Sequence, residues 1–283
     1  MIVITGATGT IGSELVRVLA GRGAPVRAVS RRPSSVRAPR GVTVVPGDYA
    51  DPAAMAAAMA GAEAVFVLGV LGPDGAEADR ALVATAVAAG ARRIVKLSAI
   101  GTGDPALGRV GTWHLPGERA VRESGIGWTV LRPSSFASNT LGWAADLRAG
   151  RPVADLTGDG AQGVVDPRDV AEVAAAALLG PERSGVVLTL TGPALLTTAG
   201  QAAVLAAELG RPVEVAEIAP ADARAHLLAA GATPEFADGA LAGQAFVRDG
   251  GNAVLTDDVE QVLGRPARSY AQWVADHRAA FTG

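Results

Sequence analysis

The feature that most constrains the fold of this chain is a regular alternation of apolar runs with alanine- and leucine-rich helical runs in its first half. Runs rich in Val and Ile occupy residues 2–5, 26–30, 42–48, 64–70, 93–101 and 128–133. These runs are continuous rather than alternating with polar residues, which is typical of parallel strands buried on both faces. Helical runs separate them at residues 13–21, 51–60, 76–89 and 116–124. The pattern predicts a doubly wound α/β sheet of the Rossmann type.

The second half of the chain has a looser rhythm. It predicts further elements as follows: a helix at 166–179, a strand at 186–192, a helix at 198–209, an edge strand at 212–218, and helices at 221–231, 234–245 and the end of the chain. No low-complexity linker separates the halves. We therefore predict a Rossmann domain over residues 1–150, its sheet completed by parts of 151–195, and a smaller C-terminal α/β substrate lobe over 196–283.

Three glycines mark the turn between the first predicted strand and the first predicted helix. Gly6, Gly9 and Gly12 form the motif G-x-x-G-x-x-G. Gly6 permits a tight turn, Gly9 lets the backbone approach a pyrophosphate, and Gly12 lets the helix pack against the strand. Amide groups at the helix N-terminus would meet the phosphates. The alternative is a turn that only packs, but its position and flanks favour an NAD(P)-binding domain.

The end of the second predicted strand indicates which dinucleotide binds. A site for NAD usually carries Asp or Glu here to bond the ribose 2′-hydroxyl. This chain has Ser30, Arg31 and Arg32 instead, and guanidinium groups suit a 2′-phosphate. We therefore predict that NADP(H) is the cofactor. The alternative for Arg32 is that it is a solvated surface residue. Asp48, after the third strand, would accept a hydrogen bond from the adenine amino group, or would otherwise be a turn residue.

Composition excludes several classes of function. The formal net charge is -3, so no basic excess favours nucleic acid or an anionic membrane. Cysteine is absent, which excludes disulfides and thiolate catalysis and fits a reducing compartment. The chain opens directly on the strand-like MIVITG, so we expect no signal peptide and a cytoplasmic location. The oligomeric state stays open.

Two scarce residue types restrict the chemistry further. The three histidines lie too far apart in the chain to form an i, i+4 metal pair, so we expect no metal. Lys96 is the only lysine among the 25 basic residues. Any mechanism that needs a lysine must therefore use Lys96.

A family resemblance joins these motifs. TGATGTIG, VSRRP, PGDYADP, VKLSAIG and GIGWTVLRPSSF occur in that order, followed by VVDPRDVAEVAAAALLGP, LTLTGPALLT and LGRPARSYAQWV. Over essentially its whole length the chain resembles the NmrA-like group of atypical short-chain dehydrogenase/reductases, most closely the branch with the NAD(P)H:quinone oxidoreductases. The resemblance is specific for the family and not for a substrate. It implies cofactor contacts as follows: Gly6, Thr8, Gly9, Thr10, Ile11, Gly12, Arg31 and Asp48, with Gly69 and Val70 after the fourth strand, and Ser98, Pro133, Ser134 and Phe136 near the nicotinamide.

The resemblance also exposes a difference. Reductases of the wider superfamily use Tyr-x-x-x-Lys, in which the tyrosine protonates the oxyanion left by hydride addition and the lysine lowers the pKa of its hydroxyl. At the matching place this chain has His114 and Glu118. The usual proton-donating pair is therefore absent. We expect Glu118 to be a first-turn acid that faces the helix dipole.

Three explanations stay open. In the first, the protein is an NADPH-dependent reductase of a quinone, or of a ketone on an aromatic substrate such as a polyketide-like one. A hydroquinone has a pKa of about 10, like a phenol, and can take its proton from water, with Ser98 or His114 as the oxyanion donor. In the second, His114 is a true general acid with a pKa near neutrality. In the third, the protein binds NADP(H) without turnover and acts as a redox sensor.

The substrate-binding candidates each have a structural alternative. Trp113 suits a flat aromatic substrate but can be a packing residue, and His114 can be a solvated loop residue. Ser98 lies where ligands bind at the carboxyl edge of such sheets, or caps a turn. Phe136 and Asn139 follow the sixth strand, where core packing and a helix N-cap are their alternatives.

Overall fold

The computed structural model describes residues 1–69, 75–180 and 184–282. Its centre is a parallel seven-stranded sheet with the order β3-β2-β1-β4-β5-β6-β8. The strands are β1 (Ile2–Ile4), β2 (Val26–Ser30), β3 (Val42–Pro46), β4 (Ala64–Val67), β5 (Arg93–Leu97), β6 (Gly127–Pro133) and β8 (Val186–Leu190). The strand order reverses between β1 and β4, where sheets of this type bind ligands beyond the carboxyl ends of their strands. The predicted doubly wound fold is confirmed.

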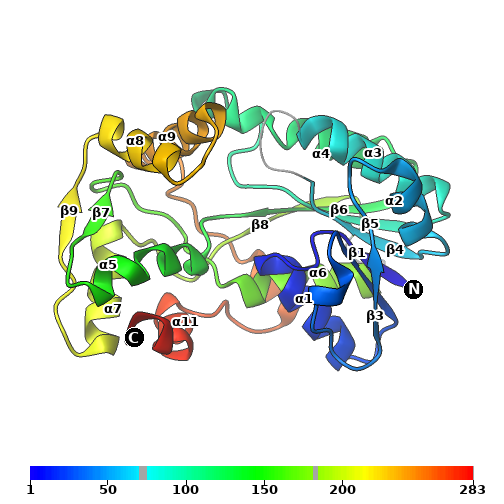
Figure 1. Ribbon diagram of the computed structural model, residues 1–283, viewed down its shortest axis with the longest axis horizontal. Helices are drawn as coiled ribbons and strands as arrows, with labels where there is room; N and C mark the ends of the chain where they lie inside the picture. Colours follow the sequence, from blue (N-terminus) through cyan, green and yellow to red (C-terminus); the bar gives the residue numbers. More distant parts are fainter. Residues whose placement is uncertain (70–74, 181–183, 283) are drawn as a thin grey trace.

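Helices cover both faces of this sheet (Figure 1). On one face lie α1 (Thr10–Gly21) and α6 (Pro167–Leu179), which share a core with β1, β4 and β5. On the other lie α2 (Pro52–Met59), α3 (Gly75–Ala88) and α4 (Leu115–Arg122). Asp51 and Asp166 cap α2 and α6 through their carboxylates, each directly before a proline, as their sequence predicts.

A smaller group of elements lies beyond the carboxyl edge of the sheet (Figure 1). It comprises the 3-10 segment η4 (Ala137–Trp143), α5 (Ala144–Arg148), β7 (Val153–Asp155), α7 (Thr198–Leu209), β9 (Val215–Glu217), α8 (Pro220–Ala229), α9 (Pro234–Arg248), α11 (Tyr270–His277) and α12 (Ala279–Thr282). The strand expected at 212–218 is β9, and it pairs in parallel with β7, which the sequence did not indicate. The side chains of Trp273 and Phe281 are buried in the core of this group.

One C-terminal segment returns to the large sheet. The helix α10 (Asp258–Leu263) packs on α6, and the Asp258 carboxylate accepts a 2.7 Å hydrogen bond from the Thr189 amide of β8. Arg265 and Arg268 then pair with Asp169, whose side chain is fully buried in α6. Residues 258–268 therefore fasten the smaller group to the sheet, although the sequence assigned them to the lobe alone. Within the described ranges, none of the helices is both long and apolar enough to cross a membrane.

Candidate cofactor and substrate site

The glycine turn between β1 and α1 has the geometry that a phosphate site requires. Gly6 has a φ of +61°, which favours glycine because side chains crowd that conformation. A Cβ on Gly12 would lie 2.1 Å from the Gly6 carbonyl oxygen, so only glycine fits there. Gly9 is the extended N-cap of α1 and offers no side chain to the first-turn amides. Those amides, which include those of Thr10 and Ile11, are therefore available for an anion.

Two hollows flank this turn. The first, of about 370 Å³, is lined by polar and basic residues that include Thr8, Ser13, Ser30, Arg31, Arg32, Ser35 and Arg37. The second, of about 760 Å³, is lined by residues that include Gly6, Thr8, Arg31, Asp48, Tyr49 and Glu77. Arg31 borders both hollows, as expected of a group that reaches a 2′-phosphate beside an adenine site. Arg37 was missed by the sequence reasoning, because it lies five residues beyond Arg32, outside the strand end that guided the prediction.

The predicted turn role and ligand role of Asp48 are compatible. Its carboxylate accepts a 3.1 Å hydrogen bond from the Ala50 amide, which shapes the turn into α2. The residue is nevertheless exposed and lines the larger hollow. The same carboxylate can therefore hold the turn and face an adenine.

Behind the end of β5 lies a buried group that we call the Lys96 cluster: Lys96, Asp79 and His114. The Lys96 side chain is 0% exposed and its Nζ lies 3.0 Å from Asp79 Oδ2. The same Nζ donates to the Leu97 carbonyl oxygen and lies 3.4 Å from His114 Nδ1. A Cβ on Gly117 would lie 2.3 Å from Asp79 Oδ2 and 2.7 Å from Lys96 Cε. Glycine at 117 is therefore what lets α4 close over this ion pair.

The partners of Lys96 determine which nitrogen of His114 carries hydrogen. An ammonium has three donors, and here Nζ meets three acceptors: Asp79 Oδ2, the Leu97 carbonyl and His114 Nδ1. The geometry thus assigns a charged Lys96 and an unprotonated Nδ1, so that the hydrogen of neutral His114 lies on Nε2. Burial lowers the pKa of Lys96, and the Asp79 carboxylate opposes that shift.

Burial and the positive charge of Lys96 lower the pKa of His114 to about 3. The expectation that His114 titrates near neutrality is therefore wrong, because burial and a neighbouring cation both disfavour the imidazolium. His114 is a neutral hydrogen-bond donor at physiological pH. It is only partly buried, at the N-cap of α4.

A second buried network occupies the hydroxyl of Ser98. Glu118 has a 0% exposed side chain and accepts hydrogen bonds from Ser98 Oγ at 2.6 Å and from Arg132 at 2.8 and 2.7 Å. Arg122 adds a 2.9 Å bond from the surface side. Burial raises the pKa of Glu118, but these hydrogen bonds outweigh it and hold that pKa below its usual value. Glu118 does lie in the first turn of α4, as predicted, but its carboxylate is a buried anion whose hydrogen-bond partners are Ser98, Arg122 and Arg132.

The same geometry weakens the case for Ser98 as an oxyanion donor. Ser98 is 4% exposed, and its only hydroxyl hydrogen is directed to Glu118 while Thr102 Oγ1 lies 3.1 Å away. This arrangement leaves His114 as the better candidate of the two.

The remaining predicted residues lie around the carboxyl edge of the sheet. Pro133 is buried at the end of β6, and buried Ser134 donates a 3.2 Å hydrogen bond to Asn252. Phe136 is half-buried against the core, and its backbone pairs with Val165. Gly69 is half-buried after β4, whereas Val70 lies outside the described residues.

Asn139 is exposed, inside η4 rather than at its N-cap. Its amide donates to Ser135 Oγ at 3.2 Å. The predicted N-cap alternative for Asn139 is therefore wrong, and a contact with substrate stays a prediction.

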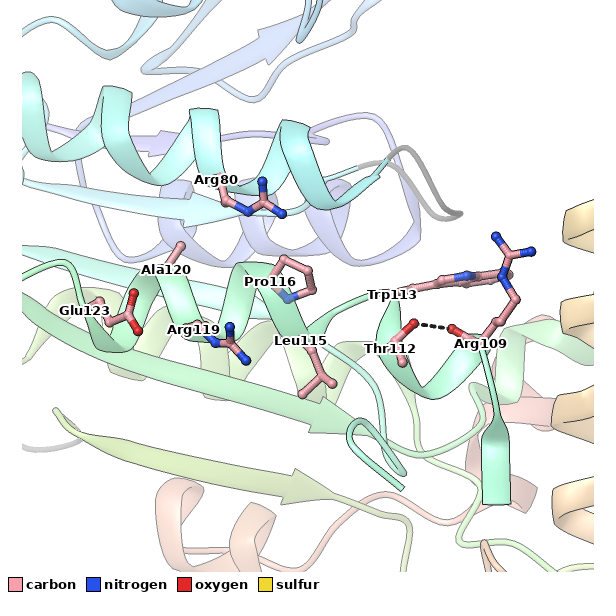
Figure 2. Close-up of a pocket in the computed structure, with 9 residues that line it drawn as sticks. All are labelled: Arg80, Arg109, Thr112, Trp113, Leu115, Pro116, Arg119, Ala120 and Glu123. Atoms are coloured by element: carbon pink, nitrogen blue, oxygen red, sulfur yellow. Dashed lines mark hydrogen bonds between the residues drawn. The ribbon is translucent and has the colours of Figure 1, made fainter. Parts of the chain in front are cut away.

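Trp113 stands between two further hollows. One is a groove of about 450 Å³ between α3 and α4 (Figure 2). The other, of about 390 Å³, lies against α9. A Cβ on Gly239 of α9 would lie 2.4 Å from the Trp113 ring, so the indole packs directly on the α9 backbone. Among the residues that the structure describes, no group of three carboxylate or histidine side chains could hold a metal ion.

Comparison with known proteins shows what this arrangement resembles. The family model described as NAD(P)H-binding matches residues 6–181. The chain is 41% identical to the (4-alkanoyl-5-oxo-2,5-dihydrofuran-3-yl)methyl phosphate reductase of Streptomyces griseus, covering 99% of each chain. It is 35% identical to the NAD(P)H azoreductase of Xenophilus azovorans, again over 99% of each. The NADPH-dependent quinone oxidoreductase of Escherichia coli, solved with NADPH, superposes with a TM-score of 0.85 at 26% identity, covering 98% of this chain and 100% of that one.

Proposed function

The chain belongs to the NAD(P)H-binding family of oxidoreductases, in its NmrA-like atypical short-chain group, and from that premise we propose which acceptor it reduces and how. The protein is an NADP-dependent oxidoreductase. We propose that its acceptors are compounds whose reduced form is a stabilised anion: quinones and acylated furanones such as the phosphorylated one named for the Streptomyces griseus relative. Aromatic ketones with a neighbouring phenol belong to the same class.

The residues described above fit the cofactor. The Gly6–Gly12 turn and the α1 amides would hold the pyrophosphate, Arg31 with Arg32 and Arg37 the 2′-phosphate, and Asp48 the adenine. When bound, NADPH supplies the hydride. The chain's own task is then to orient the acceptor and to stabilise the negative charge that the hydride leaves on it.

His114 is the group that we assign to that charge, and the 3.4 Å contact between its Nδ1 and Lys96 Nζ is the observation that carries the proposal. With Nδ1 accepting from Lys96, Nε2–H is free to donate to the oxygen on which charge develops. The donor needs no reorientation during the reaction, because Lys96 fixes the tautomer and is itself fixed by Asp79.

Lys96 adds a charge behind the donor. An ammonium hydrogen-bonded to the far side of the imidazole polarises the ring, so that Nε2–H becomes a stronger donor without transferring its proton. The final proton then comes from water. In this chain neutral His114 thus takes the place of the usual tyrosine acid, and Lys96 contacts it from β5.

The test is a set of NADPH oxidation assays at 340 nm. Menadione, methyl red, and the phosphorylated furanone with its dephosphorylated alcohol are offered in turn, each with NADPH and with NADH. We expect decay with at least the furanones or the quinone, and faster decay with NADPH than with NADH. Binding of NADPH by calorimetry without decay for any acceptor would refute the proposal and favour a redox sensor.

A further inference from the structure

A groove between α3 and α4 has a composition that the hydride-transfer site does not explain. We call it the arginine groove, and it is lined by Arg80, Arg109, Thr112, Trp113, Leu115, Pro116, Arg119, Ala120 and Glu123. Figure 2 shows these side chains along its length, with Glu123 toward one end and Trp113 and Arg109 toward the other. Its volume of about 450 Å³ lies within the range of small-ligand sites.

The arginines of this groove are not used to hold the protein together. Arg109 and Arg119 are exposed, and within the described part of the chain neither side chain makes a hydrogen bond or an ion pair. Among the residues that the structure describes, Arg80 pairs with Glu77 of its own helix alone, at 2.6 Å, with the two side chains 53% and 82% exposed. An ion pair so open to solvent contributes little and can be exchanged for a better anion.

Arginines with structural roles look different in this protein. Arg132 and Arg122 converge on buried Glu118, and Arg265 and Arg268 converge on buried Asp169. In each case two guanidiniums surround one fully buried carboxylate. The groove is lined by three arginines and by one carboxylate, that of Glu123 toward one end, in a chain whose net charge is -3. The groove therefore carries a local excess of positive charge, which an anion from outside the chain would neutralise.

The chemistry of the walls identifies the anion as an organic phosphate. The guanidiniums of Arg80 on α3 and Arg119 on α4 line the groove from its two walls, whereas Arg109 lies at the end with Trp113 (Figure 2). Two guanidiniums from different elements suit a tetrahedral dianion with three equivalent oxygens better than a planar carboxylate. Trp113, Leu115 and Pro116 supply an apolar wall for the carbon skeleton. Trp113 and Leu115, which both line the groove, flank His114 in the chain.

We propose that the arginine groove binds the phosphate monoester group of the acceptor, with Arg119 and Arg80 as its principal ligands. The assignment rests on the proposed function and deepens it, because it names the part of the acceptor that the chain recognises. A phosphate ester that is not a substrate could bind to the same residues. Binding and turnover experiments distinguish it from a phosphorylated acceptor.

Binding is measured first, without turnover. Protein saturated with NADP⁺, so that the 2′-phosphate hollow is filled, is titrated by calorimetry with 1-naphthyl phosphate and with 1-naphthol. We expect the phosphate to bind, and its Kd to rise about tenfold or more in Arg119→Ala and in Arg80→Ala. Arg22→Ala is the matched control, because Arg22 is an exposed arginine at the C-terminal end of α1, away from the groove. Equal binding of phosphate and naphthol, or an unchanged Kd in both groove variants, overturns the proposal.

Turnover then identifies the source of the phosphate. The ratio of kcat/KM for the phosphorylated furanone to that for its free alcohol should fall about tenfold in Arg119→Ala, through KM, and should not change in Arg22→Ala. If the Kd for naphthyl phosphate rises but this ratio stays constant, assignment to the acceptor is overturned in favour of a separate phosphate ester. If the protein binds naphthyl phosphate but reduces no acceptor, the proposed function fails and the assignment to an acceptor fails with it, whereas the groove remains a site for a phosphate ester.

Discussion

Replacing Lys96 by methionine is expected to destabilise the protein strongly. The Lys96 side chain is 0% exposed, and its ammonium lies 3.0 Å from the carboxylate of Asp79, which is 3% exposed. Methionine retains much of the stem but leaves the Asp79 carboxylate buried without its cation. Removal of one partner from a buried pair costs about 3–5 kcal/mol, because the remaining charge keeps its desolvation cost. Since each kcal/mol lowers the Tm of a chain of this size by about 2–4 °C, the expected fall is on the order of 10 °C.

Thermal unfolding followed by circular dichroism measures this effect, and a double variant tests its cause. Lys96→Met with Asp79→Asn removes both charges and keeps the shape of the carboxylate, so it should recover more than half of the lost Tm. Arg92→Met is the control, because Arg92 and Glu63 lie 3.7 Å apart with side chains 71% and 58% exposed, and such pairs contribute less than about 1 kcal/mol. A Lys96→Met protein that melts within about 2 °C of the wild type, or a double variant no more stable than the single one, would refute the reasoning.

Three further predictions follow from the same network and from the cofactor hollows. His114→Phe should lower kcat about 100- to 1000-fold, because it removes the Nε2 donor. The kcat of the wild type should show no histidine ionisation between pH 5 and pH 8, since the pKa of His114 is about 3. A bell-shaped pH profile of kcat centred on a histidine pKa would count against this. Arg31→Ala should raise the KM for NADPH about tenfold or more and leave that for NADH nearly unaltered; an unchanged NADPH/NADH preference would contradict the 2′-phosphate assignment. Glu118→Gln should make the free energy of unfolding depend less on pH on the acid side. The folded-state pKa of Glu118 lies below its ordinary 4.5, so the stability that this carboxylate contributes is present above that value and is lost as pH falls. Measuring the free energy of unfolding at a series of acid pH values tests this.

Much of the fold could be predicted because each element carries a local signal. All four residues of β4 are buried, and the sequence shows them as one unbroken apolar run. The strand β7 has three residues, too few for a periodicity to show, whereas β9 lies within the edge strand predicted at 212–218. Their pairing joins residues about 60 positions apart, Val153 with Val215, and depends on how the smaller group packs rather than on either segment.

The glycine turn between β1 and α1 could also be predicted, whereas the Lys96 cluster could not. The glycine spacing is local, but Asp79, Lys96 and His114 come from α3, β5 and the turn before α4. Two signals in the sequence point toward the cluster. A lone lysine in the apolar run RIVKL must find a buried counter-charge, since an unpaired ammonium there would be costly. Asp79 stands at helical spacing with Leu82, Val83 and Ala86, all buried, which places its carboxylate on the core face of α3.

The arrangement of these charges also limits the acceptor chemistry. Lys96 lies close to the candidate donor His114, but it comes from β5 rather than from the helix that follows His114. The helix position four residues after His114 holds Glu118, whose charge is neutralised by Arg132 and Arg122. His114 can therefore donate a hydrogen bond but has no dissociable proton to give at neutral pH. An alkoxide with the basicity of hydroxide, pKa about 15.7, is about 6 units more basic than a phenolate, which amounts to about 8 kcal/mol. One preorganised donor supplies only about 3–4 kcal/mol, so we expect the proposed site to stabilise a hydroquinone or enolate anion but not a simple alkoxide.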